Sequence, residues 1–291
     1  MKTGTRILIV GGGFAGVTVA QHLERTVAAN VEVVVISETN HLVFTPMLPE
    51  VVGRTISPLH VVVAGRELTR KVRWLEARIT HLDRDLQTAH YALANGEEGA
   101  LTYTQLVLAC GSRVNIGEIP GLADRGYALK TVMDAIVLGN DLIGNFEAAT
   151  AENDPVARRR LLSVVVIGGG FSGVEVAGHI ADLMRSIHRF YPELEKVPRK
   201  IHLLQKNDRI LPELNHEALS AFALKKLRQN KIDVRLGVGA KEVTPTAVGL
   251  SSGESIEAGI VVCTIGTDTQ PMIRSRRRAD IRRSYGKSPA P

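Results

Sequence analysis

The chain has 291 residues, 44% of them hydrophobic, which is enough for about two domains with packed cores. Its formal net charge of +6 lies entirely in residues 269–291, and the residues before them balance basic against acidic side chains. With aromatic residues at only 4% and no basic bias outside this tail, the composition argues against nucleic-acid binding.

The first predicted elements form one βαβ unit. Residues 5–10 (TRILIV) are a buried strand, GGGFAG is a turn, residues 14–28 have helical spacing, and residues 31–38 (VEVVVISE) are a second buried strand. A secretory leader is the alternative, because Lys2 and Arg6 lie beside an apolar run. Three consecutive glycines are poor in a signal helix but suit a strand-to-helix phosphate turn.

The next segments alternate between short apolar runs and polar turns. Residues 60–110 predict an antiparallel meander with a hairpin turn at Asn95-Gly96, followed by a core strand that ends in LVLACG. Residues 111–158 predict a connection with a helix near 131–150.

At residue 161 the strand–turn–helix pattern restarts with LLSVVVI and GGGFSG. A helix over 171–190, a strand over 200–205, a helix over 213–230 and strands at 232–236, around 247–256 and at 260–265 follow. Residues 269–291 have no periodicity and little apolar content, so we expect disorder there.

Neither a metal site nor a membrane helix is predicted. Cys110 and Cys263 each end an apolar run just before a glycine, and no zinc-type spacing occurs. The longest apolar stretch, 161–174, is interrupted by glycines.

The first glycine-rich turn has the spacing of a dinucleotide-binding fingerprint. Gly11 permits a tight turn, Gly13 admits a pyrophosphate, and Gly16 lets the helix pack on its strand. The helix N-terminus, with Phe14 and Ala15, then faces the phosphates and stabilises their charge. Glu38 follows the next strand, where a carboxylate would accept hydrogen bonds from ribose hydroxyls.

A second fingerprint repeats the first. Its cofactor-binding candidates are Gly168, Gly170, Phe171, Ser172 and Gly173. Its strand end carries Gln205 and Lys206 where NAD specificity usually requires an acid, so a 2′-phosphate is less disfavoured than usual. We expect NADH to be the preferred donor.

Two further features have both a functional and a structural interpretation. Glu175 lies on the helix turn nearest the second cofactor cleft, or is simply a carboxylate that stabilises a helix start. Thr45-Pro46 predicts a bend that covers an isoalloxazine ring, or an ordinary proline loop.

The sequence resembles the pyridine-nucleotide flavoprotein reductases with two dinucleotide-binding domains, and most closely the type II NADH dehydrogenases. The matching segments, in the family's order, are ILIVGGGFAG, HLVFTPMLPE, QLVLACGSRVN, VVVIGGGFSGVEVAG and VCTIGT. The resemblance implies an α/β fold with two Rossmann-like FAD/NAD(P)-binding domains and an antiparallel β-meander insertion. The expected boundaries are 1–110 for the FAD domain, 111–158 for a connection, 159–268 for the NAD(P) domain and 269–291 for the tail.

The resemblance also implies roles for individual residues. Glu175 matches a family glutamate near the nicotinamide and flavin, and is the candidate catalytic residue. The implied FAD contacts are Gly11, Gly13, Gly16, Glu38, Thr45, Pro46 and Gly111, and the implied NADH contacts are Gly168, Gly170, Gly173 and Glu175, with Gln205 and Gly266 added as cofactor-binding candidates. The segment 36–52 has no cysteine, so the redox CxxxxC of the disulfide reductases is absent.

The resemblance predicts hydride transfer from NADH to FAD and electron transfer to a quinone. A reductase of a protein electron carrier such as ferredoxin or rubredoxin is the first alternative. The family's C-terminal flavin-phosphate motif, quinone-site helix and membrane anchor have no match in the sequence, so a C-terminally truncated, inactive nucleotide-binding chain is the second. The expected location is the cytoplasm, or the cytoplasmic membrane face if anchored, with a homodimer as one assembly.

Overall fold

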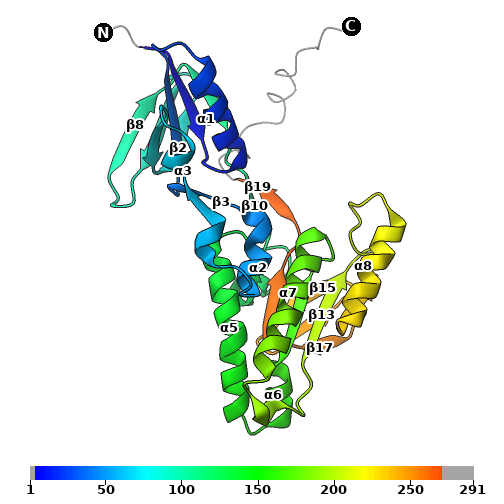
Figure 1. The fold of residues 1–291 in the computed structure, drawn as a ribbon. Helices are drawn as coiled ribbons and strands as arrows, with labels where there is room; N and C mark the ends of the chain where they lie inside the picture. The colour runs from blue at the N-terminus through cyan, green and yellow to red at the C-terminus, as the bar shows by residue number, and fades with distance from the viewer. Residues whose placement is uncertain (1–3, 271–291) are drawn as a thin grey trace. The chain divides into compact units, whose positions relative to one another are not determined.

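The computed structural model describes residues 4–270 as two compact units (Figure 1). The first unit comprises residues 4–43, 62–113 and 268–270, and the second comprises residues 44–61 and 114–267. The chain therefore crosses between the units more than once. The tail predicted for residues 269–291 lies outside the described residues from residue 271 onward.

The first unit is built on a four-stranded parallel sheet with the strand order β5-β2-β1-β9. In that order the strands span Arg73–Glu76, Glu32–Ser37, Arg6–Val10 and Gln105–Leu108. Val10 is in register with Ile36 on one side and with Leu108 on the other. The predicted βαβ unit is confirmed, and the strand that ends in LVLACG joins the same sheet.

Alternate residues of β1 point to opposite faces of this sheet, as the period of a strand requires. Ile9 packs toward helix α1 (Phe14–Thr26) in a cluster that includes Trp74, and α3 (Gly65–Leu68) contacts α1. Leu8 and Val10 pack toward the opposite face. That face is covered by the predicted antiparallel meander, which is formed by β6 (Arg78–Asp83), β7 (Thr88–Ala92) and β8 (Glu98–Thr102) (Figure 1). Strands β3 (His41–Val43) and β4 (Val62–Ala64) form a separate antiparallel pair.

The second unit is built on a five-stranded parallel sheet with the order β11-β18-β12-β13-β14. In that order the strands span Gly126–Ala128, Ile260–Cys263, Ser163–Ile167, Lys200–Gln205 and Ile232–Leu236. Helix α7 (Phe171–His188) contacts β12 and β13, and α8 (Glu217–Gln229) contacts β14. A short 3-10 turn, η3 (Pro192–Leu194), precedes β13.

One face of this sheet is covered by a second antiparallel meander. Its strands are β15 (Ala240–Val243), β16 (Ala247–Leu250) and β17 (Ser255–Glu257), and α4 (Leu122–Arg125) packs beside it. Val248 and Leu250 of the meander are fully or almost fully buried with Val165 and Ile167 of β12. Burial of these apolar side chains on both sides fixes the position of β12 in the sheet.

A helical layer completes the second unit. Helix α5 (Val132–Ala151) begins at a capping box in which Thr131 and Asp134 exchange hydrogen bonds, and α6 (Pro155–Leu161) packs against it. The segment 44–61 contributes η1 (Thr45–Met47), α2 (Leu48–Val52) and η2 (Pro58–Val61). Helix α2 packs against both α5 and α7 (Figure 1). The chain passes between the two units in β10 (Ser112–Val114) and again in β19 (Thr267–Thr269). None of the helices within residues 4–270 has the length and apolar character of a membrane span.

Candidate nucleotide-binding sites

The turn between β1 and α1 uses glycines to bring backbone atoms close together. Gly11 has a φ of 108° and donates its amide hydrogen to the Ile36 carbonyl over 2.8 Å. A Cβ atom on Gly16 would collide with the Gly11 carbonyl oxygen, so the helix lies as close to the turn as glycine permits. A Cβ atom on Gly13 would have no neighbouring group within 4 Å. The turn is therefore tight on its inner side and open at Gly13, where a pyrophosphate would approach.

The N-terminus of α1 has the character of an anion site. Gly13 is its N-cap residue and no side chain caps this end, while Phe14 and Ala15 are exposed in the first turn. The first amides of a helix have no partner within the helix, and together they form its positive end. Glu38 is exposed just beyond β2, and Gly111 has a φ of 64° with open space around it.

The turn between β12 and α7 repeats this construction. Gly168 has a φ of 112° and donates its amide hydrogen to the Leu204 carbonyl over 2.8 Å. A Cβ atom on Gly173 would collide with the Gly168 carbonyl oxygen. Gly170 is the N-cap residue of α7 and again no side chain caps the helix, which presents Phe171 and Ser172 to solvent. The two predicted fingerprints thus adopt the same strand–turn–helix geometry in separate units.

The strand ends beside the two turns differ in charge. Val10 pairs with Ile36 and Ile167 pairs with Leu204, so Gln205 occupies the position of Ser37 and Lys206 that of Glu38. The Gln205 side chain is buried, and its Oε1 atom accepts a hydrogen bond of 2.9 Å from the Gly169 amide. The Gln205 side chain therefore stabilises the turn from inside the protein. Neither Gln205 nor Lys206 is an acid, in contrast to Glu38 in the first unit.

Sequence reasoning missed two residues that lie against the second turn. Thr264 donates its hydroxyl hydrogen toward the carbonyl oxygens of Ile167 and Gly168, at 2.9 and 3.1 Å, and so holds the turn from the side of β18. The Glu213 carboxylate lies 3.2 Å from the position that a Cβ atom on Gly170 would take. Both residues are distant from the turn in sequence, and their residue types carry no local signal. Gly266, a predicted contact, has a φ of 64° and accepts a backbone hydrogen bond from Asn115.

The predicted flavin-covering bend lies in the second unit. Phe44 donates its amide hydrogen to the Val61 carbonyl over 2.7 Å, which closes the segment 44–61 into a loop. Thr45 and Pro46 begin η1, and Pro46 is exposed. Their proposed contact with a flavin remains a prediction.

Three titratable side chains gather where α2 packs on α7. Glu50 comes from α2, and Glu175 and His179 lie one turn apart on α7. The His179 Nε2 atom lies 4.0 Å from the Glu50 Oε1 atom. The pKa of Glu175 is raised, chiefly by partial desolvation and then by the negative charge of Glu50, while His179 acts in the opposite direction. Glu175, the predicted catalytic residue, is exposed and therefore accessible.

The sequence of residues 5–287 matches the family described as "Pyridine nucleotide-disulphide oxidoreductase". The chain belongs to this family. The match covers both glycine-rich turns and the segment 44–61.

Curated relatives of this family member include an external alternative NAD(P)H-ubiquinone oxidoreductase B1 of Arabidopsis thaliana, which is 32% identical over 92% of the chain and 49% of its own length. The type II NADH:quinone oxidoreductase of Mycobacterium tuberculosis is 27% identical over 92% of the chain and 59% of its own length. The resemblance to type II NADH dehydrogenases is thereby confirmed. The chain spans about half the length of the curated relatives it matches.

Solved structures give the same fold. NDH2 from Plasmodium falciparum in complex with NADH aligns with a TM-score of 0.87 at 22% identity, and covers 93% of the chain and 57% of its own. The predicted fold class, with its two Rossmann-like units, is confirmed by this likeness and by the parallel sheets.

Several features of this family member lie apart from the glycine-rich turns. The sequence has two cysteines and none within 36–52. In residues 4–270 no group of histidine, cysteine or acidic side chains is arranged to hold a metal ion.

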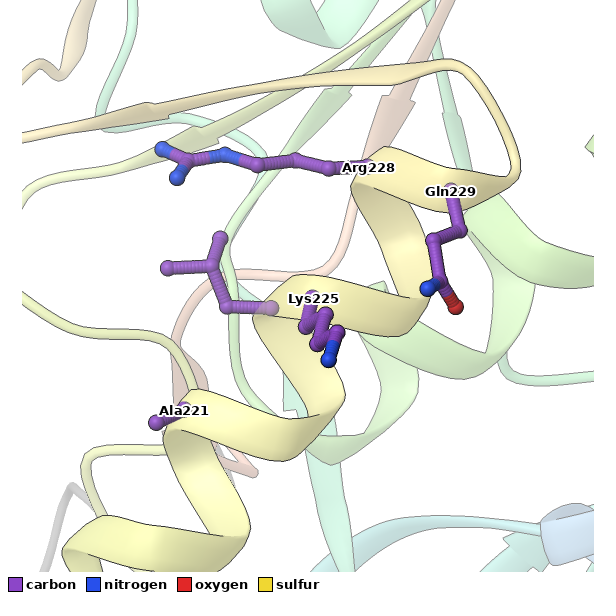
Figure 2. Close-up of a pocket in the computed structure, with 5 residues that line it drawn as sticks. Ala221, Lys225, Arg228 and Gln229 are labelled. Carbon is purple, nitrogen blue, oxygen red and sulfur yellow. The ribbon is translucent and has the colours of Figure 1, made fainter.

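A shallow hollow beside α8 is lined by Ala221, Leu224, Lys225, Arg228 and Gln229, with the last two directed away from the helix (Figure 2). A second hollow follows β13 and is lined by Asn207, Asp208, Arg209, Pro212 and Glu217.

Proposed function

We propose that this chain carries the nucleotide-binding part of an FAD-dependent NADH dehydrogenase that reduces a quinone. The observation that carries the proposal is the repetition of one glycine-rich turn, with the same close backbone approach, at the start of α1 and of α7. The names of the relatives, which are NAD(P)H-ubiquinone and NADH:quinone oxidoreductases, support the choice of reaction.

The first turn fits the pyrophosphate of FAD. Gly13 leaves a cradle that any side chain would fill, and the uncapped end of α1 supplies amides and a positive dipole for the phosphates. We assign the remaining FAD contacts to the residues that the family resemblance indicates, which are Glu38, Thr45, Pro46 and Gly111. Glu38 is exposed, and its carboxylate can accept hydrogen bonds from ribose hydroxyls.

The second turn fits the pyrophosphate of a nicotinamide cofactor. Gly168 and Gly173 close the turn, and the uncapped N-terminus of α7 begins at Gly170, where the Glu213 carboxylate lies close by. Gln205 and Gly266 complete the proposed contacts. NADH is the proposed donor, and NADPH is a second donor because neither Gln205 nor Lys206 repels a 2′-phosphate.

When bound, FAD would supply the redox chemistry, accepting a hydride and releasing electrons to the acceptor. The chain's own task is to bind and orient the two cofactors. We propose that Glu175 acts beside the nicotinamide as a group that holds a proton, which its raised pKa and exposed position support. A peripheral contact with the cytoplasmic face of a membrane and a homodimer complete the proposal, and both come from the family resemblance alone.

The test uses the full chain reconstituted with FAD under anaerobic conditions. Addition of NADH should bleach the flavin absorbance, and a soluble quinone should restore it faster than an iron–sulfur protein does. Faster recovery with the iron–sulfur protein would favour a reductase of a protein electron carrier. No bound flavin, or no bleaching, would overturn the proposal.

A further inference from the structure

The cluster formed by Glu50, Glu175 and His179 has a role that follows from its packing. We propose that these three side chains share one proton, and that Glu50 and His179 are positioning residues which determine whether Glu175 holds it. This inference rests on the proposed function, in which Glu175 serves the nicotinamide site.

The geometry brings the three groups together within the second unit. Glu175 and His179 stand at positions i and i+4 of α7, and such side chains are neighbours on one helix face. Gly53, at the end of α2, allows the two helices to meet, because a Cβ atom there would lie 3.1 Å from the His179 Nδ1 atom. Glu50 is carried by the same short helix, 4.0 Å from the imidazole.

The burial of single atoms shows that the cluster is not a simple ion pair. The Glu50 Oε2 and His179 Nδ1 atoms are shielded from solvent, and neither has a hydrogen-bond partner among the residues that the structure describes. A buried polar atom without a partner costs free energy, so its retention calls for an explanation. The side chains as a whole remain 32% and 26% exposed, which lets protons exchange with water.

The charges of the cluster make the position of a proton sensitive to each member. Two carboxylates and one imidazole are in proximity, so a proton on Glu175 removes its repulsion with Glu50, whereas a proton on His179 creates an attraction to Glu50. The raised pKa of Glu175 has this origin in part, because Glu50 raises it and His179 lowers it. A proton held at Glu175 is also chemically useful, since oxidation of NADH by a quinone takes up one proton from the medium.

The other charged groups around the two helices have partners of their own. The Arg54 guanidinium, after α2, donates to the Asn140 side chain of α5 over 2.7 Å. Asp182 of α7 pairs with Arg185 at 3.0 Å. The strands beneath α7 contribute His202 of β13, which pairs with Asp233. η1, which packs on α2, has no titratable side chain. Helix α5, which packs on α2, carries Asp134, Asp141 and Glu147. These carboxylates accept hydrogen bonds from the Thr131 amide, the Tyr127 hydroxyl and the Tyr191 hydroxyl. The cluster therefore responds mainly to its own three members.

The test is a titration of the full chain labelled with ¹³C at the glutamate carboxyl carbon, with the Glu175 signal assigned from E175Q. E50Q should move the Glu175 titration to lower pH, and H179Q should move it to higher pH. E50D, which keeps the charge, should restore much of the E50Q shift. D182N removes a carboxylate from the same helix outside the cluster, and should leave the titration in place.

The two substitutions are expected to act with opposite sign, which a merely structural role would not produce. The inference would be overturned if E50Q left the midpoint of the Glu175 titration unchanged, or if E50Q and H179Q moved it in the same direction. A shift in D182N as large as that in E50Q would also overturn it. The acidic limb of kcat/KM for NADH oxidation should move in parallel with the titration. The titration needs no NADH, so its result bears on this inference alone. An inactive chain would contradict the proposed function but would leave the titration result unaffected.

Discussion

Replacement of Gly16 with alanine tests whether close packing at the first turn stabilises the first unit. The added Cβ atom would collide with the Gly11 carbonyl oxygen and lie 3.5 Å from the Ala109 Cβ atom. The collision is with backbone, so no side chain can rotate away and α1 must move off the sheet. Overpacking of this kind costs roughly 1–3 kcal/mol, and we expect the upper end. Alanine stabilises a helix by about 1 kcal/mol relative to glycine, so the free energy of unfolding should fall by about 2 kcal/mol in total.

The single tryptophan of the chain reports on this change. Trp74 is 5% exposed and belongs to the same buried cluster as Val17 and Ala20 of α1. Urea unfolding followed by its fluorescence should therefore monitor the first unit. With a urea dependence of about 2 kcal/mol per molar, the midpoint should fall by about 1 M.

The matched control is the same substitution three residues earlier. A Cβ atom on Gly13 meets no group, and its backbone is extended, so Gly13→Ala should change the free energy of unfolding by less than about 0.5 kcal/mol. An unchanged midpoint for Gly16→Ala, or an equal loss in Gly13→Ala, would refute the packing argument.

The remaining predictions test the assignment of the two nucleotides and the electrostatics of the second unit. Gly13→Val should abolish FAD binding, measured by flavin absorbance after gel filtration, whereas Gly170→Val should spare it and abolish NADH binding; loss of the same nucleotide in both would contradict the assignment. Lys206→Glu should raise the ratio of kcat/KM for NADH over NADPH by placing a carboxylate at the position that Glu38 takes in the first unit, and an unchanged ratio would show that this position does not reach the ribose. The pKa of His202 is lowered, chiefly by burial, so the unfolded chain binds more protons and the second unit should lose stability as pH falls below about 6.5. Asp233→Asn removes the charge that favours protonated His202, so hydrogen exchange of β13 at pH 5 should accelerate more than at pH 7, and equal acceleration at both would argue against this origin.

Local patterns in the sequence were sufficient to predict the two strand–turn–helix units. In each unit an apolar strand, three glycines and a helical period follow one another directly, so their geometry depends on steric rules that act over a few residues. The strands at 200–205 and 232–236 and the Asn95-Gly96 hairpin were predicted for the same reason, and they are confirmed. The sequence also indicated the charge of both strand ends, because residue type alone determines it.

Only the tertiary structure determined which distant side chains meet. The sequence did not show that the segment 44–61 packs with α5 and α7 in the second unit, where helix α2 has its partners. That packing places Glu50 next to His179, and no periodicity in the sequence relates these two residues. Two further contacts depend on the sheet that brings their strands and loops together. They are the hydrogen bond from the Gly169 amide to Gln205 and the approach of Glu213 to Gly170. Such contacts arise from the burial of whole elements, which is non-directional and leaves little trace in the local sequence.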